Sequence, residues 1–351
     1  MKAALLAAGK GKRLRPATEA RPKPLLPIAG STLFEYNFSL ISDLQVYAVV
    51  SYRKELFIDL SQRLNFKVVD QGKPMGTGHA VMKLGEEVKD DILLIYADIY
   101  LPPDSVERIL SYRDRYDHVV AVTPVERPWE FGVVELSSGL LRRIVEKPRR
   151  GEEPSNLIVA GAFFLSQSIF DHLMDVTLSP RGEIELTDAL TLAASRGERV
   201  GVVTISPWVD AGRPSDFLLA QKYLLNDVIS GERSPPEGYV LEGDILISST
   251  GVIESSELEG PSVVAGLLRE STLGPYSYLE AGSRVANSKV LNSVVMRGSS
   301  VLKSEVTDSL IADDGVVEGS TLTSSVTAPS SRIVNCEIEG EKVWESRVCV
   351  T

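Results

Sequence analysis

Hydrophobic residues in the first two-thirds of the chain follow two alternating patterns. Short apolar runs, typical of buried strands, occur at residues 46–50, 92–96 and 200–205. Between these runs, apolar residues recur with the helical period at residues 33–44, 79–88, 104–116 and 186–195. Strands that alternate with such helices are typical of a parallel sheet covered by helices. The pattern therefore predicts an α/β domain with a mostly parallel sheet at residues 1–228.

A polar segment separates this region from the rest of the chain. Residues 230–238 include two prolines and two glycines but no apolar residue, which is the composition of a linker. We place the linker at residues 229–242 and a second domain at residues 243–351.

The second domain has a shorter period. Residues 243–328 lack helical periodicity and contain short pairs of Val, Leu or Ile among Ser, Gly and Glu. A six-residue spacing connects three runs of apolar residues: Val252, Leu258 and Val264; Leu273, Leu279, Val285 and Leu291; and Leu310, Val316 and Leu322. This period is typical of a parallel β-helix, in which each face of a coil points one apolar side chain inward. An all-β sandwich, with turns roughly every 8–12 residues, fits less well. The breaks in phase predict inserted loops or an irregular solenoid.

Length and charge exclude several classes of protein. The 351 residues can bury large cores without metal or disulfide cross-links. The net charge is −11, and because neutralising nucleic-acid phosphates needs a basic face, we expect no nucleic-acid partner. A small phosphate-bearing ligand needs only a local group of cations. No apolar run is long enough for a signal peptide or a membrane span, so we expect a soluble, cytoplasmic protein without a membrane partner.

Cysteine and histidine are rare in the chain. The cysteines Cys336 and Cys349 lie near the C-terminus, and the sequence leaves open whether they pair. The histidines His79, His118 and His172 are far apart in the sequence. Because there is no CxxC pair and no Cys/His cluster, we expect neither structural zinc nor redox chemistry.

A glycine-rich segment with several cations spans residues 6–16. Gly9 and Gly11 allow backbone N–H groups to approach phosphate oxygens closely, and Arg13 adds a fork of charged donors. The segment is not a Walker loop, and it is not a dinucleotide fingerprint, because Leu14 stands where that motif needs glycine. Alone, it is more typical of a strand-to-helix turn with solvated lysines.

A second segment, which follows closely, changes that interpretation. Lys23 lies between Pro22 and Pro24, which stiffen the backbone and aim the side chain reproducibly. A rigidly held lysine beside a cationic glycine-rich segment suits the α-phosphate of a nucleoside triphosphate under attack. A proline-rich surface loop does not account for the pairing of the two segments.

Together, residues 6–16 and 21–30 resemble the signature of sugar-1-phosphate nucleotidylyltransferases. The resemblance implies a Rossmann-like nucleotidyltransferase domain whose substrates are a nucleoside triphosphate and a sugar 1-phosphate. It implies that Arg13 and Lys23 are catalytic. The backbone contacts that it implies for the nucleotide are at Ala8, Gly9 and Gly11.

Residues 71–80 resemble the family's segment for binding a pyrimidine base. By this resemblance Gln71, Gly76 and Thr77 contact the base, and an amide offers the donor and acceptor that an imide edge requires. The sequence of residues 76–80 is similar to that of uridylyltransferases, whereas thymidylyltransferases more often lack a threonine at the position of Thr77. His79 would belong to this loop, although a lone histidine that opens a helix is more often structural.

Two aspartates resemble the family's metal ligands. Asp98 follows the apolar run 92–96, at the strand end where ligands of open α/β sheets bind. Asp210 lies in a segment similar to the family's second acidic motif. By resemblance both hold Mg²⁺, which prefers carboxylate and phosphate oxygens. Without the resemblance, an aspartate at such a position is most often a helix cap or a turn residue.

Three further segments, at residues 131–134, 144–148 and 181–188, resemble the family's sugar-phosphate site. The residues implied by these segments are Gly132, Glu146, Lys147 and Glu183, and a fourth segment at residues 159–161 adds Val159. Lys147 would hold the phosphate and Glu146 a sugar hydroxyl, although the two alone would be an exposed pair at a strand end. Glu183 is equally compatible with capping a helix. Val159 stands where N-acetylglucosamine-specific relatives carry asparagine, so we expect glucose 1-phosphate as acceptor.

The C-terminal region is similar to the left-handed β-helix of the long form of glucose-1-phosphate thymidylyltransferase. Some relatives carry an acetyltransferase there, which needs a histidine base, and the last histidine of this chain is His172. We therefore expect a role in homo-oligomeric assembly or regulation. The alternatives are an N-acetylglucosamine-1-phosphate uridylyltransferase, a GDP-mannose-forming enzyme and a non-catalytic regulatory relative. Gln71 and the complete set of phosphate and metal residues favour a pyrimidine-specific enzyme.

Overall fold

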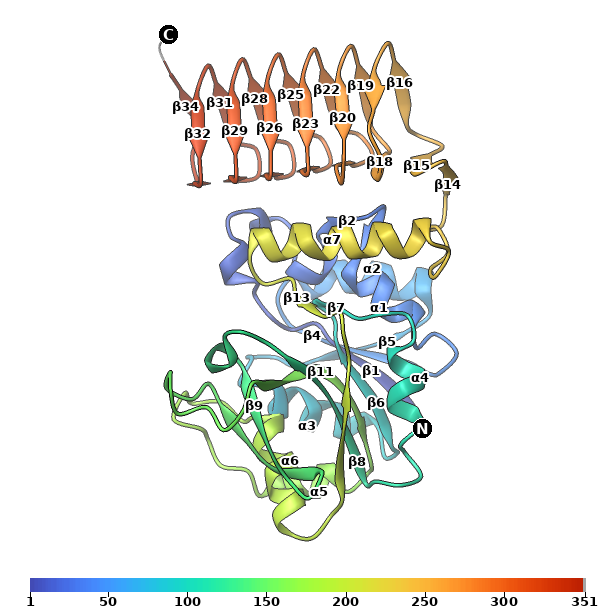
Figure 1. Cartoon of the computed structure of the whole chain (residues 1–351), viewed down its shortest axis with the longest axis vertical. Coiled ribbons are helices and arrows are strands. Elements are labelled where there is room, and N and C mark those ends of the chain that lie inside the picture. Colours follow the sequence, from blue (N-terminus) through green and yellow to red (C-terminus); the bar gives the residue numbers. More distant parts are fainter. Residues whose placement is uncertain (350–351) are drawn as a thin grey trace. The chain divides into compact units, whose positions relative to one another are not determined.

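The structure is a computed structural model that describes residues 1–349 (Figure 1). The chain forms two compact units, each of which combines two separate stretches of the sequence. The first unit contains Met1–Gly9 and Asn37–Trp208, and the second contains Lys10–Tyr36 and Val209–Thr351. The segment with Arg13 and Lys23 therefore belongs to the same unit as the C-terminal repeats. The domain boundaries at residues 228 and 243 stay a prediction.

The first unit is built on a mixed sheet that contains nine of the described strands. Its path is β10, β9, β11, β6, β1, β4 and β5, with β8 beside β11 and β12 beside β8. The strands are β1 (Lys2–Leu6), β4 (Val46–Val50), β5 (Lys67–Asp70), β6 (Ile92–Tyr96), β8 (His118–Pro124), β9 (Gly132–Ser137), β10 (Leu140–Glu146), β11 (Leu157–Leu165) and β12 (Val200–Thr204). Shorter strands of the chain are β2 (Pro27–Ile28), β3 (Ser31–Thr32), β7 (Ile99–Tyr100) and β13 (Val209–Asp210).

Strands β6, β1, β4 and β5 are parallel, which confirms the predicted α/β class. Strand β11 runs antiparallel to β6, β8 and β9, and β9 pairs with β10 as a hairpin. These antiparallel strands follow from the connections, because the only helical segment in residues 125–156 is the 3₁₀ turn η4 (Pro128–Glu130), which is too short for a parallel crossover.

Helices α3, α5 and α6 contribute buried residues to the core of this sheet, among them Leu84, Ile169 and Leu190. The helices of the chain are α1 (Leu33–Ser39), α2 (Lys54–Leu64), α3 (Thr77–Glu87), α4 (Ser105–Leu110), α5 (Ile169–Met174), α6 (Leu186–Ser195) and α7 (Pro214–Ile229). No helix in the described part of the chain has the length and apolar character that crossing a membrane requires.

Two predicted helices are shorter in the structure. The helix predicted at residues 33–44 ends at Ser39, and the one predicted at 104–116 ends at Leu110. After each helix the chain continues in a tight turn. Ile41 N–H donates to Phe38 O in the first turn, and Arg113 N–H donates to Leu110 O in the second. These three-residue bonds preserve the apolar spacing without extending the α-helix.

The C-terminal region of the second unit is a left-handed parallel β-helix, as predicted. Its first sheet contains β14 (Tyr239–Glu242), β15 (Ile245–Ser248), β18 (Ser262–Val264), β21 (Tyr278–Leu279), β24 (Val294–Val295), β27 (Leu310–Ile311), β30 (Val326–Thr327) and β33 (Lys342–Val343). Its second contains β16 (Val252–Glu254), β19 (Leu267–Arg269), β22 (Arg284–Ala286), β25 (Ser300–Leu302), β28 (Val316–Glu318), β31 (Arg332–Val334) and β34 (Arg347–Val348). Its third contains β17 (Glu257–Leu258), β20 (Thr272–Gly274), β23 (Lys289–Leu291), β26 (Glu305–Thr307), β29 (Thr321–Thr323) and β32 (Glu337–Glu339).

The period of this β-helix corrects the sequence analysis. Partner strands pair Val290 with Val306 and Val306 with Leu322, so the middle coils have 16 residues rather than 18, while coils near the two ends differ from 16 by one or two residues. The six-residue phase therefore drifts. Four residues of the predicted runs are in the core: Leu273, Leu279, Val285 and Leu322. Val252, in contrast, is 45% exposed. At two other positions the core residue is the neighbour of the predicted one, namely Val290 instead of Leu291 and Val317 instead of Val316. The breaks in phase reflect this drift and not inserted loops.

Tight corners shorten the coil. All three corners contain a left-handed residue, but those at Asn287 (φ 50°) and Asn292 (φ 42°) join their strands through two residues, whereas the corner at Gly298 (φ 73°) uses four. A buried serine follows each corner. Ser304 Oγ donates to Leu302 O (2.7 Å) and accepts the Ser320 N–H of the next coil (3.0 Å). The serines of the sequence pattern thus form ladders in which buried hydroxyls are hydrogen-bonded.

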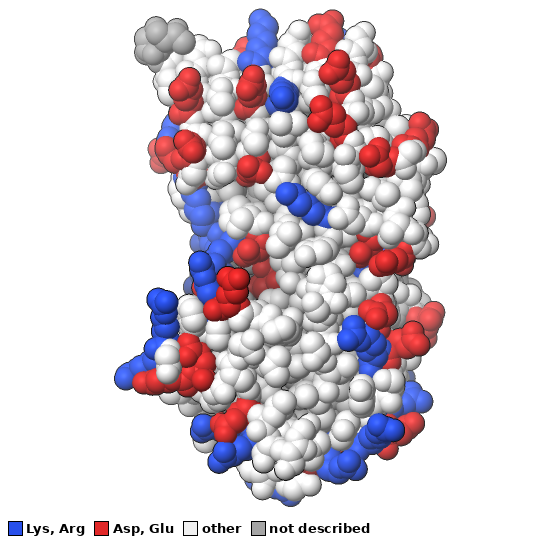
Figure 2. Space-filling model, viewed as in Figure 1, with Lys and Arg blue, Asp and Glu red and all other residues white. Residues whose placement is uncertain are grey.

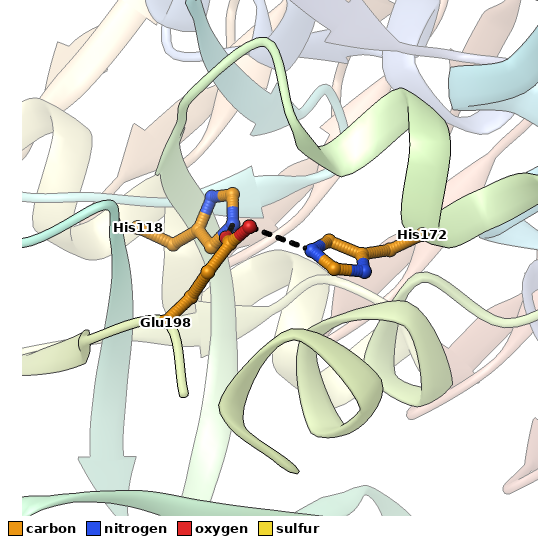
Figure 3. A group of neighbouring side chains, drawn as sticks. All are labelled: His118, His172 and Glu198. Carbon is orange, nitrogen blue, oxygen red and sulfur yellow. Dashed lines mark hydrogen bonds and ion pairs between the residues drawn. The ribbon is translucent and has the colours of Figure 1, made fainter. Parts of the chain in front are cut away.

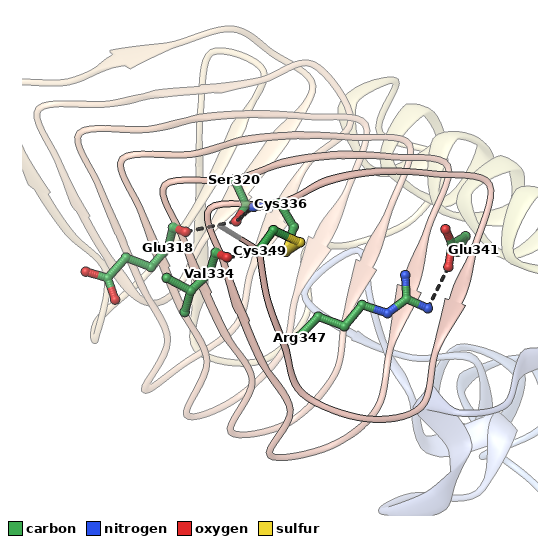
Figure 4. The surroundings of a disulfide bond; sticks show 7 residues. All are labelled: Glu318, Ser320, Val334, Cys336, Glu341, Arg347 and Cys349. Atoms are coloured by element: carbon green, nitrogen blue, oxygen red, sulfur yellow. Dashed lines mark hydrogen bonds and ion pairs between the residues drawn. A yellow bond between two sulfur atoms is a disulfide. The ribbon is translucent and has the colours of Figure 1, made fainter. Parts of the chain in front are cut away.

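A disulfide closes the C-terminal end of the described β-helix. Cys336 occupies a serine-ladder position, where its N–H donates to Ser320 Oγ, and its sulfur is bonded to Cys349 (Figure 4). The pairing that the sequence left open is therefore present. Arg347 forms an ion pair with Glu341 in the same stretch (2.7 Å).

Lys, Arg, Asp and Glu side chains are interspersed on the surface that Figure 2 shows. The positive charge needed to bind a phosphate ligand would therefore have to come from a few residues at the site itself.

Candidate active site

In the second unit, Asp210 brings together the two cations predicted to be catalytic. Its Oδ2 accepts a hydrogen bond from Arg13 Nη2 (2.7 Å), and its Oδ1 accepts one from Lys23 Nζ (2.8 Å). Burial alone would raise the pKa of Asp210, but Lys23 and Arg13 hold it below its ordinary value. The carboxylate is therefore ionised and keeps both cations in one place.

Glycines allow this close arrangement. Gly11 has φ 59°, and a Cβ there would lie 2.8 Å from Lys23 Cβ. A Cβ at Gly212 would lie 2.3 Å from Arg13 Nη2. The hydroxyl of Thr18 donates to Gly11 O (3.1 Å) and closes the loop between the two motifs. The structure thus shows how two separated segments of sequence pack against one another.

In the first unit, Ala8, Gly9 and Asp98 lie at one edge of the sheet. Ala8 and Gly9 follow β1, and Asp98 follows the adjacent parallel strand β6. The Ala97 N–H bonds Leu6 O (3.0 Å), so the two strand ends are joined. Carboxyl ends of parallel strands are where such sheets bind ligands.

The donor set is compatible with a divalent metal. Asp210 is held ionised, each of its oxygens has a lone pair beyond the bond that it accepts, and Asp98 adds a second hard oxygen ligand. Asp98 belongs to the first unit and Asp210 to the second, so their joint metal site stays a prediction.

The loop predicted to bind the base is tightly ordered. The buried Gln71 donates from Nε2 to Gly76 O (3.0 Å) and to His79 Nδ1 (3.1 Å). Burial, with Lys83, lowers the pKa of His79, which keeps this acceptor neutral. Both amide hydrogens of Gln71 are thus used inside the loop, which leaves its carbonyl Oε1 as the atom that it can offer a ligand.

This loop is joined to the segment that contains Glu183. Gly76 has φ 105°, and a Cβ there would lie 2.4 Å from Ile184 O. Thr77 Oγ1 accepts the Leu186 N–H (3.2 Å). The predicted base-binding and sugar-binding segments are therefore neighbours.

Arg181, which the sequence analysis did not nominate, is surrounded by three carboxylates. Its Nη2 lies 3.4 Å from Glu146 Oε1 and 3.1 Å from Glu183 Oε2, and it also bonds Glu185. Burial raises the pKa of Glu146, while the charge of Arg181 opposes that shift. The signal available in the sequence was the presence of Arg181 beside the acidic residues Glu183 and Glu185, because carboxylates that lie close together favour a nearby cation.

The other predicted sugar residues adjoin this group. Gly132 pairs with Glu146, and a Cβ on Gly132 would lie 2.8 Å from Glu146 Oε2. Lys147 is exposed and begins the turn after β10 with φ 46°. Val159 is partly buried on β11, just before an irregularity in pairing at Gly161.

A second cluster joins His118, His172 and Glu198 in the first unit (Figure 3). Sequence reasoning missed it, because its members are separated by 80 and 26 residues. His118 Nε2 lies 2.7 Å from Glu198 Oε2, and His172 Nε2 lies 2.8 Å from Glu198 Oε1. The spacing alone would suit a metal.

The outer hydrogen bonds argue against one. Ser166 N–H donates to His118 Nδ1 and Arg196 Nη1 donates to His172 Nδ1, both at 3.2 Å. Since these partners only donate, both Nδ1 atoms carry the lone pair and the ring protons lie on Nε2. A metal would need those Nε2 lone pairs. The cluster is therefore a hydrogen-bonded structural element, and the expectation of no structural zinc is compatible with it.

Comparisons with known proteins identify the family to which the chain is similar. Residues 2–227 match the family model described as nucleotidyl transferase. The chain is 39% identical over 259 residues to the bifunctional protein GlmU of Methanococcus maripaludis, covering 72% of this chain but only 62% of that protein. It is 31% identical to a glucose-1-phosphate thymidylyltransferase of Streptomyces griseus, covering 85% of this chain and 87% of the relative. Among solved structures, a UDP-glucose pyrophosphorylase complexed with UDP-glucose is 25% identical and superposes with a TM-score of 0.58, over 65% of this chain and 99% of the other.

Proposed function

The chain belongs to the nucleotidyl transferase family of sugar-1-phosphate nucleotidylyltransferases, and we propose that it transfers a nucleotidyl group from UTP or dTTP to a hexose 1-phosphate. The products would be an NDP-sugar and pyrophosphate. The observation that supports this most directly is the Arg13–Asp210–Lys23 cluster, in which one ionised carboxylate orients two cations.

The reaction needs no general base, because a sugar phosphate is already an anion at neutral pH. Its oxygen forms the new bond to the α-phosphorus while the bond to the bridging oxygen of the β-phosphate breaks, and pyrophosphate leaves with that electron pair. Lys147 would hold the attacking phosphate. Arg13 and Lys23 would stabilise the charge that develops on the α-phosphate, so catalysis rests on positioning and electrostatics. Mg²⁺ bound by Asp98 and Asp210 would neutralise charge on the triphosphate oxygens.

The base would be recognised through Gln71. Its free carbonyl Oε1 accepts from the imide N–H that uracil and thymine share, so this contact favours a pyrimidine without separating UTP from dTTP. The guanine base of GTP also carries a ring N–H, but its larger two-ring body would have to fit a loop packed against residues 183–186. Pyrimidines are therefore preferred to GTP.

Glucose 1-phosphate is the proposed acceptor. Val159 offers an aliphatic side chain where an amide would be needed to hydrogen-bond an acetamido group. The partly buried Glu146, whose pKa is raised by burial, can hydrogen-bond a sugar hydroxyl. N-acetylglucosamine 1-phosphate is the alternative acceptor to be tested beside it.

Pyrophosphate release tests the proposal. The full-length protein with Mg²⁺ would be offered UTP, dTTP or GTP, each with glucose, N-acetylglucosamine or mannose 1-phosphate. We expect turnover with a pyrimidine nucleotide and glucose 1-phosphate, and a roughly 10²–10³-fold lower kcat for Lys23→Ala. Lys289→Ala, on the exposed surface of the β-helix, is the control.

No release with any pair would indicate a non-catalytic relative. Unchanged turnover of Lys23→Ala would contradict the assignment of the site. The β-helix contains none of the chain's three histidines, so we propose assembly or regulation and not acetyl transfer as its role. Sedimentation of the purified protein tests the predicted homo-oligomer.

A further inference from the structure

Arg21 lies directly before the Pro22–Lys23 step of the second motif and reaches the β-helix within the same unit. Its Nη1 and Nη2 donate to the two oxygens of Glu280, both at 2.7 Å. Its Nε and Nη2 donate to the two oxygens of Asp313, at 3.1 and 2.6 Å. A single guanidinium thus makes two bidentate pairs, a geometry that lysine cannot reproduce.

The two carboxylates come from different coils of the β-helix. Glu280 follows β21 and Asp313 follows β27, which are separated in the first sheet by β24. Glu280 also accepts the backbone N–H of Arg297 from the coil between them (2.6 Å). The Arg21 side chain is 14% exposed and the Asp313 side chain 5%. The partners are therefore fixed by the solenoid and not by flexible loops.

A second contact reaches the first motif from the last coil. Lys342, the first residue of β33, donates from Nζ to the backbone carbonyl of Arg13 (2.6 Å). A third link runs through the fully buried Gln221 of α7. Its side chain accepts a hydrogen bond from the Ala29 N–H (3.3 Å) and donates one to Tyr276 O (2.7 Å). The segment 10–36 is thus held by the first sheet of the β-helix at several points.

These contacts act on the two residues that the proposed reaction needs. Lys342 bonds the backbone of Arg13 itself, and Arg21 is separated from Lys23 only by Pro22, whose ring restricts the backbone. Asp210 and the loop bond from Thr18 to Gly11 also contribute to the placement of Lys23 and Arg13. We propose that Arg21 and Lys342 are positioning residues, through which the β-helix sets the geometry of the phosphate-binding cations. This inference rests on the proposed function.

The experiment compares full-length Arg21→Lys and Lys342→Met with matched controls. Lys289→Met changes the first residue of β23, another exposed strand of the β-helix, and Arg284→Lys changes an exposed arginine of β22. Hydrogen–deuterium exchange of residues 10–26 reports the positioning directly and needs no substrate. Steady-state kinetics with the pair that the wild-type protein turns over reports its effect on the reaction.

We expect both variants to exchange faster in residues 10–26, while coils at residues 284–323 keep wild-type exchange. We expect kcat to fall by ~10- to ~100-fold, because small displacements of reacting groups carry costs of this size, with little change in KM for the sugar phosphate. The controls should match the wild type in both measurements. A drop in kcat without global unfolding separates positioning from a purely structural role.

Three results would decide against parts of this picture. Wild-type exchange in both variants would show that the β-helix does not order the segment. Faster exchange with an unchanged kcat would overturn the positioning role. If the wild-type protein turns over no substrate pair, the proposed function fails, and the exchange data alone still decide whether the β-helix orders residues 10–26.

Discussion

Single residues of the site illustrate what sequence can and cannot predict. The cations Arg13 and Lys23 lie in short motifs that their neighbouring glycines and prolines make recognisable in the sequence. In the structure both cations contact Asp210. Arg181 has no such trace, because its importance arises from carboxylates that come from β10 and from its own loop. His118 and His172 likewise become a pair only through folding.

Asp210 and Asp216 are expected to respond oppositely to the loss of charge. In Asp210→Asn, the buried Lys23 ammonium loses its ion pair, and we expect a loss of about 3 kcal/mol in unfolding free energy. Burial, with the charge of Asp210, raises the pKa of Asp216, so Asp216→Asn should be neutral or stabilising. Urea denaturation at pH 7 measures both. Equal destabilisation of the two variants would contradict the ion-pair argument.

The same pKa directions predict how acid acts. Because the pKa of Asp210 is lowered in the fold, its stabilisation is present above the ordinary aspartate value, about 3.9, and is lost as pH falls below it. The wild-type protein should therefore lose its advantage over Asp210→Asn in this acidic range.

His118 gives a second pH dependence at higher pH. Burial lowers its pKa despite the opposing charge of Glu198, so the unfolded chain binds more protons than the native state below the ordinary histidine value, about 6.5. Stability should fall as pH drops from 7 to 5. His118→Gln, which can still donate to Glu198, should show a shallower fall in thermal midpoint. Parallel pH curves for variant and wild type would contradict this assignment.

At the scale of elements, chain connections explain the main differences from expectation. Strands β9, β10 and β11 are antiparallel because no helix separates them, a feature that hydrophobic periodicity alone does not report. In the β-helix, the type of element was predictable from the short apolar period. The 16-residue length of its middle coils was not, because two of the three corners join their strands through only two residues, which shortens the step between core residues from six to five.

The serine ladders belong to the same lesson. In the sequence, these serines separate apolar pairs and would be expected in exposed turns. In the structure, however, Ser288, Ser304 and Ser320 are buried. Each satisfies its hydroxyl within the solenoid, since its Oγ bonds one carbonyl of its own coil and one N–H of the next. Composition therefore indicated a repeat, and only the hydrogen bonds show why serine fits it.

At the scale of the whole molecule, a solenoid is stabilised mainly by contacts between neighbouring coils. The disulfide lies in the last described coil. It joins Cys336 to Cys349, 13 residues later, and Cys349 N–H also bonds Val334 O (3.0 Å). Cross-links of about this loop length contribute ~3 kcal/mol in the chain-entropy model.

Because coils contribute locally, removing the disulfide should loosen the last coil and leave the others unchanged. We expect Cys349→Ser, or the wild-type protein under reducing conditions, to show faster hydrogen–deuterium exchange at residues 337–348. Exchange at β22 to β29, far along the solenoid, should not change. Glu345→Gln, at an exposed position of the same coil, serves as a control that keeps both cysteines. Uniformly faster exchange along all coils would show that the solenoid opens as one cooperative body, and the local account of its stability would then be wrong.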